Sequence, residues 1–214
     1  MPRTSPSAIA DDLRASEPRL GRVIELVGLP PARRAIPVAQ RFERLSVAIL
    51  HQQLAGAAAA TITRRVIDVL GGSISPEGIV GASTVTLRSC GVSEAKDRAL
   101  RDLAMRVLDG RLVLSSLGRR SDHAVVAELS AVRGIGRWTA EMFLMGPLGR
   151  HDIWPVGDLG VRNGWAIIAE LDAVPDAASL EEVADHVRPW RSTLAWYCWQ
   201  AVDVARSNGG LLPR

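Results

Sequence analysis

The residues with the clearest chemical potential in this sequence form a glycine turn followed by a helix. Gly134 and Gly136 stand two positions apart, so the chain can reverse there without a side-chain clash and leave backbone N–H groups accessible. The next residues, Trp138–Met145, are expected to form a helix whose N-terminus faces this turn. Because free N–H groups and the positive end of the helix dipole converge there, between Arg133 and Arg137, the turn could bind a phosphate. The same pattern also fits an ordinary helix–helix turn.

A single aspartate, Asp158, stands out downstream of the turn, in the sequence WPVGDLGVR. It immediately precedes an expected helix, where its side chain can act as an N-cap by accepting a hydrogen bond from the first helical N–H groups. The positive dipole at a helix N-terminus also favours the ionised carboxylate. Spacing alone therefore identifies Asp158 as a cap, and a chemical role requires a more specific pattern.

The composition is typical of a soluble globular protein that could form one or two domains. The chain has 214 residues, of which 47% are hydrophobic and 23% charged, and its formal net charge is +3. Lys96 is the sole lysine, so the other 25 basic residues are arginines, the side chain best suited to bidentate phosphate contacts. A GC-rich genome would produce the same bias. The charge therefore permits nucleic-acid binding without demonstrating it.

The cysteine, histidine and hydropathy patterns exclude several kinds of site and location. Cys90 and Cys198 lie far apart with no CxxC motif, which excludes a cysteine-ligated zinc or iron–sulfur site within the chain and indicates buried thiols in a reducing compartment. The four histidines show no metal-ligand spacing. No apolar run is long enough to span a membrane, and the first residues lack the hydrophobic region of a signal peptide. We therefore expect a cytoplasmic protein, nucleoid-associated if bacterial, with no membrane partner.

The elements that position these residues are expected to be helices throughout, because no segment shows the alternation and turn signals of strands. Apolar residues at helical spacing predict two helices within 39–70, joined at the polar junction His51-Gln52-Gln53-Leu54. A helix–turn–helix is expected over 86–110, and further helices after Asp158, from Ser179 and over 191–210. The sequence therefore predicts an all-α fold of about ten helices.

Several stretches resemble one known family. GIGRWTA at 134–140, followed about twenty residues later by GDLGVR at 157–162, resembles the helix-hairpin-helix (HhH-GPD) DNA glycosylase superfamily, most closely its alkylation-repair branch of AlkA-like 3-methyladenine DNA glycosylases. ILHQQLAGAAAATI at 49–62 and RPWRSTLAWYCW at 188–199 are similar to the same branch. The resemblance implies a two-lobed all-α fold with a central cleft and no N-terminal β domain. The implied core spans 39–206, with the hairpin at about 129–145, between an N-terminal helical extension of 1–38 and a C-terminal tail of 207–214.

The resemblance also implies the residues that act on the base. Asp158 is expected to be the catalytic residue that serves excision of a damaged base, which such enzymes first flip out of the DNA helix. A stacking pocket for that base is expected from Trp138, Trp199 and Met142, with Trp199 the strongest candidate. Electron-rich rings suit an N-alkylated purine because such a base carries a positive charge.

DNA contacts are implied for two further groups of residues. Either Gln53 or Leu54 is expected to be the wedge that fills the vacated base stack. The residues expected to bind a DNA phosphate are Gly134, Gly136, Arg137 and Thr139. In this family the hairpin often also holds a monovalent cation, here Na⁺ or K⁺, on the backbone carbonyls of Ser130, Val132 and Ile135.

The implied reaction is hydrolysis of the N-glycosidic bond of an alkylated base, 3-methyladenine or 7-methylguanine, which leaves an abasic site. A base alkylated at N3 or N7 is already a good leaving group, so one carboxylate that stabilises the oxocarbenium-like state could suffice. Related enzymes that also cut the strand use a hairpin lysine, and here that position is Trp138. We therefore expect no lyase activity, no required cofactor and no iron–sulfur cluster. The expected partner is double-stranded DNA with damaged bases, bound by a monomer.

Two alternatives remain open at this point. One is a glycosylase for deaminated or oxidised bases. The other is a non-catalytic helix-hairpin-helix DNA-binding module, which would need the glycine turn but not Asp158, Trp199 and the Gln-Gln-Leu element together.

Overall fold

The computed structural model describes residues 5–209, and this part of the chain is helical, with no strand. The four short 3-10 helices are η1 (Pro18–Leu20), η2 (Val38–Gln40), η3 (Leu117–Arg119) and η4 (Asp185–Val187). The α-helices are α1 (Pro6–Ser16), α2 (Gly21–Val27), α3 (Arg41–His51), α4 (Gly56–Val69), α5 (Pro76–Gly81), α6 (Thr84–Ser89), α7 (Glu94–Leu108), α8 (Asp122–Ser130), α9 (Arg137–Met145), α10 (Leu159–Ile168), α11 (Ala177–Leu180) and α12 (Arg191–Ser207). The predicted all-α fold is confirmed. Among the described helices, none combines the length and apolar character needed to cross a membrane.

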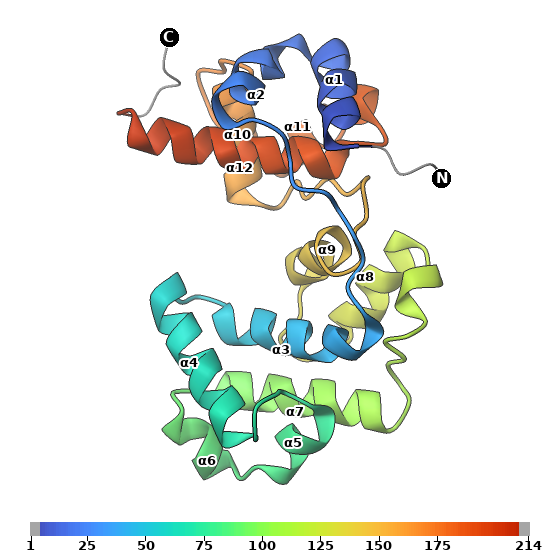
Figure 1. Cartoon of the computed structure of the whole chain (residues 1–214), viewed down its shortest axis with the longest axis vertical. Helices are drawn as coiled ribbons and strands as arrows, with labels where there is room; N and C mark the ends of the chain where they lie inside the picture. The colour runs from blue at the N-terminus through green and yellow to red at the C-terminus, as the bar shows by residue number, and fades with distance from the viewer. Residues whose placement is uncertain (1–4, 210–214) are drawn as a thin grey trace. The chain divides into compact units, whose positions relative to one another are not determined.

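The described chain forms two compact units. The central unit comprises residues 35–148, and the terminal unit combines 5–34 with 149–209. In the terminal unit α1 contacts η4 and α2 contacts α12, so the N-terminal helices pack with the C-terminal ones (Figure 1). The expected N-terminal extension, 1–38, is helical in its described part and contributes α1 and α2 to this unit. Helix α12 ends at Ser207, the first residue of the expected tail and earlier than the end of the helix expected over 191–210. Residues 210–214 of that tail lie outside the described range.

The core of the terminal unit is the packing of α10 against α12. Gly164 makes it possible: a Cβ at this position would overlap the backbone carbonyl of Cys198 in α12. Val161, Trp165 and Ile168 bury the same side of α10. Because the two helices meet backbone to backbone at Gly164, the start of α10 is fixed relative to α12.

The central unit is built on α3 and α7. Leu45 and Ile49 of α3 and Leu100 and Leu103 of α7 are fully buried, and α4 packs on α3 while α5 packs on α7 (Figure 1). The ammonium group of Lys96 in α7 donates a 2.7 Å hydrogen bond to the carbonyl of Leu50, near the end of α3. Burial lowers the pKa of Lys96. The sole lysine is therefore used to hold the end of α3.

The helix expected to start at Ser179 is shorter and begins earlier. Asp176 is the N-cap, and its side chain accepts a 2.7 Å hydrogen bond from the N–H of Ser179, so that α11 starts at Ala177. The helix ends at Leu180, whose carbonyl accepts a 2.9 Å hydrogen bond from the indole of Trp154. The same carbonyl also accepts a 3.3 Å hydrogen bond from the N–H of Val183, so the chain continues beyond α11 in a turn.

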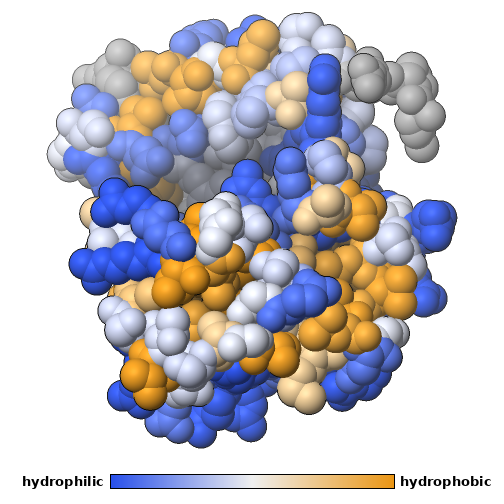
Figure 2. Space-filling model, turned by 60° about the horizontal axis from the view of Figure 1, so that its bottom comes forward, coloured by the Kyte–Doolittle hydropathy of each residue, from blue (hydrophilic) through white to orange (hydrophobic). Residues whose placement is uncertain are grey.

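Both cysteines are buried and unpaired, as expected. The exposed large apolar side chains include Val80, Val85, Met105, Leu108 and Val113 of the central unit. On the face that Figure 2 brings forward, apolar areas alternate with hydrophilic ones.

Gly164 allows a direct test of the α10–α12 contact. We expect Gly164→Ala to cost at least about 3 kcal/mol of unfolding free energy, because the added methyl group meets backbone and can be accommodated only by separating the helices. Denaturant unfolding measures the loss. Gly21→Ala is the matched control, since its Cβ would meet nothing within 4 Å and its φ of −50° suits alanine. Equal stability of the two variants would contradict the close packing.

Candidate functional site

Asp158 caps helix α10, as its position in the sequence predicts. Its Oδ1 atom accepts a 2.8 Å hydrogen bond from the N–H of Val161 and a 3.0 Å hydrogen bond from the indole Nε1 of Trp199 in α12. The residue is only 9% exposed. These two donors fix the orientation of the carboxylate.

Two residues near Asp158 affect this arrangement: Gly160 leaves space for the indole, and Cys198 is a buried thiol. A Cβ at Gly160 would lie 2.9 Å from Cδ1 of Trp199 and 3.0 Å from Oδ1 of Asp158, so glycine is needed where the indole meets the carboxylate. Cys198 lies next to Trp199 in the sequence and is fully buried; burial, and then the charge of Asp158, raise the pKa of its thiol. It stays protonated, so it is not a nucleophile.

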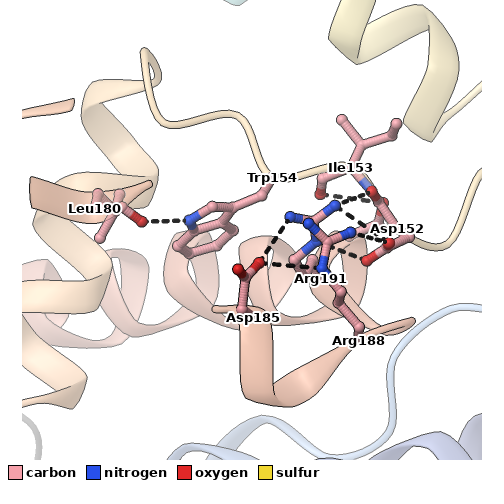
Figure 3. Close-up of polar contacts among 8 residues, drawn as sticks. Asp152, Ile153, Trp154, Leu180, Asp185, Arg188 and Arg191 are labelled. Atoms are coloured by element: carbon pink, nitrogen blue, oxygen red, sulfur yellow. Dashed lines mark hydrogen bonds and ion pairs between the residues drawn. The ribbon is translucent and has the colours of Figure 1, made fainter. Parts of the chain in front are cut away.

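The segment that leads into Asp158 is held by an ion-pair cluster. Arg191 donates from Nε to Oδ1 of Asp152 (2.6 Å) and from Nη2 to its Oδ2 (3.2 Å), and Arg188 donates to Oδ2 at 2.7 Å. Arg188 also donates to Asp185 at 3.0 Å. Figure 3 shows the two guanidinium groups between the two carboxylates. The bidentate contact fixes residue 152, six residues before the cap.

Backbone contacts complete this attachment. The hydroxyl of Ser192 accepts a 2.9 Å hydrogen bond from the N–H of Ile153 and lies 3.3 Å from its carbonyl oxygen. The N–H of Ser192 donates to the carbonyl of His151 at 2.9 Å. The RPWRS stretch therefore anchors the loop that carries Asp158. Sequence reasoning missed Asp152, Arg191 and Ser192 as functional residues, because nothing in local spacing links positions 39 residues apart.

The predicted glycine turn and helix are both present in the central unit. Gly134 has a φ of +77°, a conformation that favours glycine, and its Cβ would lie 3.0 Å from that of Ala99 in α7. Gly136 is the N-cap of α9 and, as a glycine, makes no side-chain capping hydrogen bond. Arg137 donates to Glu141 at 2.8 Å while 69% of its side chain stays exposed. The turn thus presents a helix N-terminus beside an exposed arginine.

The turn is attached to α7 through Asp102. Its Oδ2 atom accepts hydrogen bonds from the backbone N–H of Arg133 (2.7 Å) and from Nε of Arg106 (2.9 Å). Burial opposes ionisation of Asp102, but these two donors prevail and lower the pKa of the carboxyl. Within the turn, the carbonyl of Val132 accepts from the N–H of Ile135 at 3.1 Å.

The residues of the predicted wedge lie in the loop between α3 and α4. Gln53 has a φ of +57°, the left-handed conformation that costs a non-glycine residue about 1–2 kcal/mol. Leu54 beside it is 40% exposed. The side chain of Gln52 donates to the carbonyl of Gly134 at 2.8 Å. The predicted wedge residues therefore lie in a loop that combines a strained backbone with an exposed apolar side chain.

The predicted pocket residues are distributed over both units. Thr139 and Met142 line a recess of about 500 Å³ within the central unit, together with Val47, Ala48 and Phe143. Trp138 belongs to the same unit and is 48% exposed. Thr139 is only 5% exposed, and its hydroxyl lies 3.4 Å from Nε2 of Gln52. Asp158 and Trp199 belong to the terminal unit, where the structure brings them into contact.

Comparison with known proteins identifies one family. The family described as HhH-GPD superfamily base excision DNA repair protein matches residues 47–190. The chain is 30% identical over 196 residues to DNA-3-methyladenine glycosylase 1 of Schizosaccharomyces pombe, covering 90% of this chain and 86% of that one. A solved structure of 3-methyladenine DNA glycosylase Mag1 from that yeast, in complex with abasic DNA, is 29% identical with a TM-score of 0.83, covering 92% and 97% of the two chains. A DNA-3-methyladenine glycosidase from Bacillus halodurans is 32% identical with a TM-score of 0.79, covering 90% and 88%.

The two roles of Asp158, cap and charge, can be separated by substitution. We expect Asp158→Ala to lower the unfolding free energy by about 1 kcal/mol, because the N–H of Val161 loses its acceptor, while Asp158→Asn stays close to wild type since asparagine caps equally well. Denaturant unfolding of the three proteins measures this. A loss as large in the asparagine variant as in the alanine variant would contradict the capping geometry. Asp158→Asn is then the variant that removes charge alone.

Proposed function

Since this chain belongs to the HhH-GPD superfamily of base excision DNA repair proteins, in the branch of DNA-3-methyladenine glycosylases, we propose that it hydrolyses the N-glycosidic bond of alkylated bases such as 3-methyladenine and 7-methylguanine, with Asp158 as the catalytic residue. The observation that supports this assignment most directly is the carboxylate of Asp158, held by Val161 and Trp199 at the start of α10. A non-catalytic DNA-binding module would use Asp158 only as the cap of α10.

The proposed reaction requires one negatively charged group beside the sugar of the flipped nucleotide. As the bond from C1′ to the base nitrogen breaks, its electron pair leaves with the base, and positive charge develops on the sugar. The carboxylate of Asp158 stabilises this charge and takes a proton from the water molecule that adds to C1′. A base alkylated at N3 or N7 is already positively charged and departs neutral, so no acid is needed to protonate it. The product is an abasic site.

The base is proposed to be held by aromatic stacking, with Trp199 and Trp138 as the rings and Met142 at the recess in the central unit. A positively charged purine gains cation–π attraction from such rings. The hydrogen bond from Nε1 to Asp158 fixes the indole plane of Trp199 beside the catalytic carboxylate. One side chain thereby orients the anion and offers a face to the base.

The DNA backbone is proposed to be bound by the hairpin of α8 and α9. The central unit contains 14 Lys and Arg residues against 10 Asp and Glu residues, so its charge favours an anionic partner. The residues that would contact the phosphate are Gly134, Gly136, Arg137 and the N–H of Thr139. A sodium or potassium ion on the carbonyls of Ser130, Val132 and Ile135 would add positive charge, since a carbonyl oxygen that already accepts one hydrogen bond retains a second lone pair.

The gap left by the flipped base is proposed to be filled from the loop between α3 and α4. Gln53 and Leu54 are both exposed there, and the left-handed backbone at Gln53 holds the loop in a sharp turn. We also propose that the protein acts on double-stranded DNA as a monomer, in the cytoplasm.

Release of free bases from methylated duplex DNA tests the function. We expect wild type to release 3-methyladenine or 7-methylguanine, and Asp158→Asn to bind the same DNA with similar affinity while its single-turnover rate falls at least about a hundredfold, as expected on loss of a charge that acts in the transition state. Chromatography of released bases and a binding assay on both proteins measure this.

The outcomes separate the candidate functions. No release of alkylated bases by wild type would contradict the proposed substrates, and a panel of deaminated and oxidised bases would then test the other glycosylase activities. No release from any of these substrates would leave a DNA-binding module. Full activity of Asp158→Asn would exclude Asp158 as the catalytic residue.

The absence of lyase chemistry is a separate prediction. Lys96 donates to the carbonyl of Leu50 at 2.7 Å, and the hairpin position used for Schiff-base formation in related enzymes holds Trp138. We expect no covalent complex when the protein is mixed with abasic DNA and borohydride, while an established glycosylase-lyase forms one in parallel. A trapped complex that disappears in Lys96→Arg would contradict this prediction.

A further inference from the structure

The side chain of Gln52 connects two parts of the central unit that are far apart in the sequence. Its Nε2 atom donates to the carbonyl of Gly134 at 2.8 Å and lies 3.4 Å from the hydroxyl of Thr139. Gly134 is in the hairpin turn, and Thr139 is in the first turn of α9. One amide group thus bridges both sides of the segment where the phosphate is proposed to bind.

Gln52 lies directly beside the residues of the predicted wedge. It is the C-cap residue of α3 and immediately precedes Gln53, whose φ is +57°, and the exposed Leu54. The other side of the same helix end is held by Lys96, which donates to the carbonyl of Leu50. The α3–α4 loop is therefore attached on one side to α7 and on the other to the hairpin.

The hairpin turn that Gln52 contacts is also attached to α7. The N–H of Arg133 is bound by Asp102 of α7, and the conformation of Gly134 directs its carbonyl to Gln52. Both segments are thus fastened independently to α7, and Gln52 joins them directly. A glutamine suits this place because its NH₂ group has two donor hydrogens, which can serve a carbonyl and a hydroxyl together.

We propose that Gln52 is a positioning residue that couples the hairpin to the wedge loop, so that gripping the DNA backbone at Gly134–Thr139 places Gln53 and Leu54 in register with the base step to be opened. The inference rests on the proposed function, because it assigns a use to the wedge. Gln52 itself contacts neither the base nor the phosphate in this mechanism. Its amide group links the position of the hairpin turn to the position of the wedge loop.

If Gln52 couples the hairpin to the wedge loop, its substitution should impair base flipping and leave DNA binding largely unchanged. Gln52→Met keeps the length of the side chain and removes both donors, so the hairpin can still hold a phosphate while the wedge loses its register. We expect affinity for undamaged duplex to stay within about twofold of wild type, and the single-turnover excision rate to fall about tenfold, the change expected when one hydrogen bond is lost on the way to the transition state. The fluorescence rise of 2-aminopurine placed beside an uncleavable lesion, which reports unstacking, should fall in parallel.

The matched control is Gln40→Met, at the other end of α3, where the glutamine side chain makes no capping hydrogen bond. We expect this variant to behave as wild type in all assays. A merely structural role for Gln52 would lower thermal stability and affinity for undamaged duplex together with excision. Such a uniform loss, or normal unstacking by Gln52→Met, would overturn the proposal.

Amide hydrogen exchange in the free protein separates this inference from the proposed function. In Gln52→Met we expect faster exchange both in the loop at 52–55 and in the turn at 133–139, but not in Gln40→Met. Acceleration confined to the loop would overturn the coupling. If wild type released no base from methylated DNA while both segments loosened together, the proposed function would fail and the mechanical link would stand.

Discussion

The contact on which the terminal unit depends is the backbone-to-backbone approach of α10 and α12 at Gly164. It brings the N-terminus of α10 beside the middle of α12, so that the cap residue Asp158 meets the indole of Trp199. A second glycine, Gly160, leaves space for the indole at that point. Close packing of two helices is therefore what turns an ordinary N-cap into an oriented carboxylate, since a side-chain contact of 3 Å tolerates little movement of either helix.

Two aspartates six positions apart illustrate how environment assigns different roles to one residue type. Asp152 is matched by the guanidinium groups of Arg188 and Arg191, so its charge serves to anchor the loop. Asp158 accepts hydrogen bonds from the N–H groups of Val161 and Trp199, so its carboxylate is oriented at the start of α10. The ion pairs of Asp152 hold the segment that leads to Asp158. The two arginines that form them belong to the RPWRS stretch at the start of α12.

The central unit solves a similar positioning problem with hydrogen bonds to backbone. Lys96, Asp102 and Gln52 each bind a main-chain atom, at Leu50, Arg133 and Gly134 respectively. Because these contacts are made to main-chain atoms, they hold the loops without using the side chains of the residues they bind. They place the hairpin turn and the strained Gln53 loop as parts of one scaffold, although neither segment has a core of its own.

Helix positions, the glycine turn and the cap at Asp158 could be predicted from the sequence, because each depends on interactions within a few residues: apolar spacing, the freedom of glycine and a side chain next to a helix start. The family was also readable from short motifs. The early start and end of α11, the indole of Trp199 on Asp158, the Arg191–Asp152 anchor and the Gln52 bridge could not be read in this way. The last three join residues that are distant in the chain, as does the hydrogen bond from the indole of Trp154 to the carbonyl of Leu180. Local patterns specify which elements form, and only packing in three dimensions selects which side chains then meet.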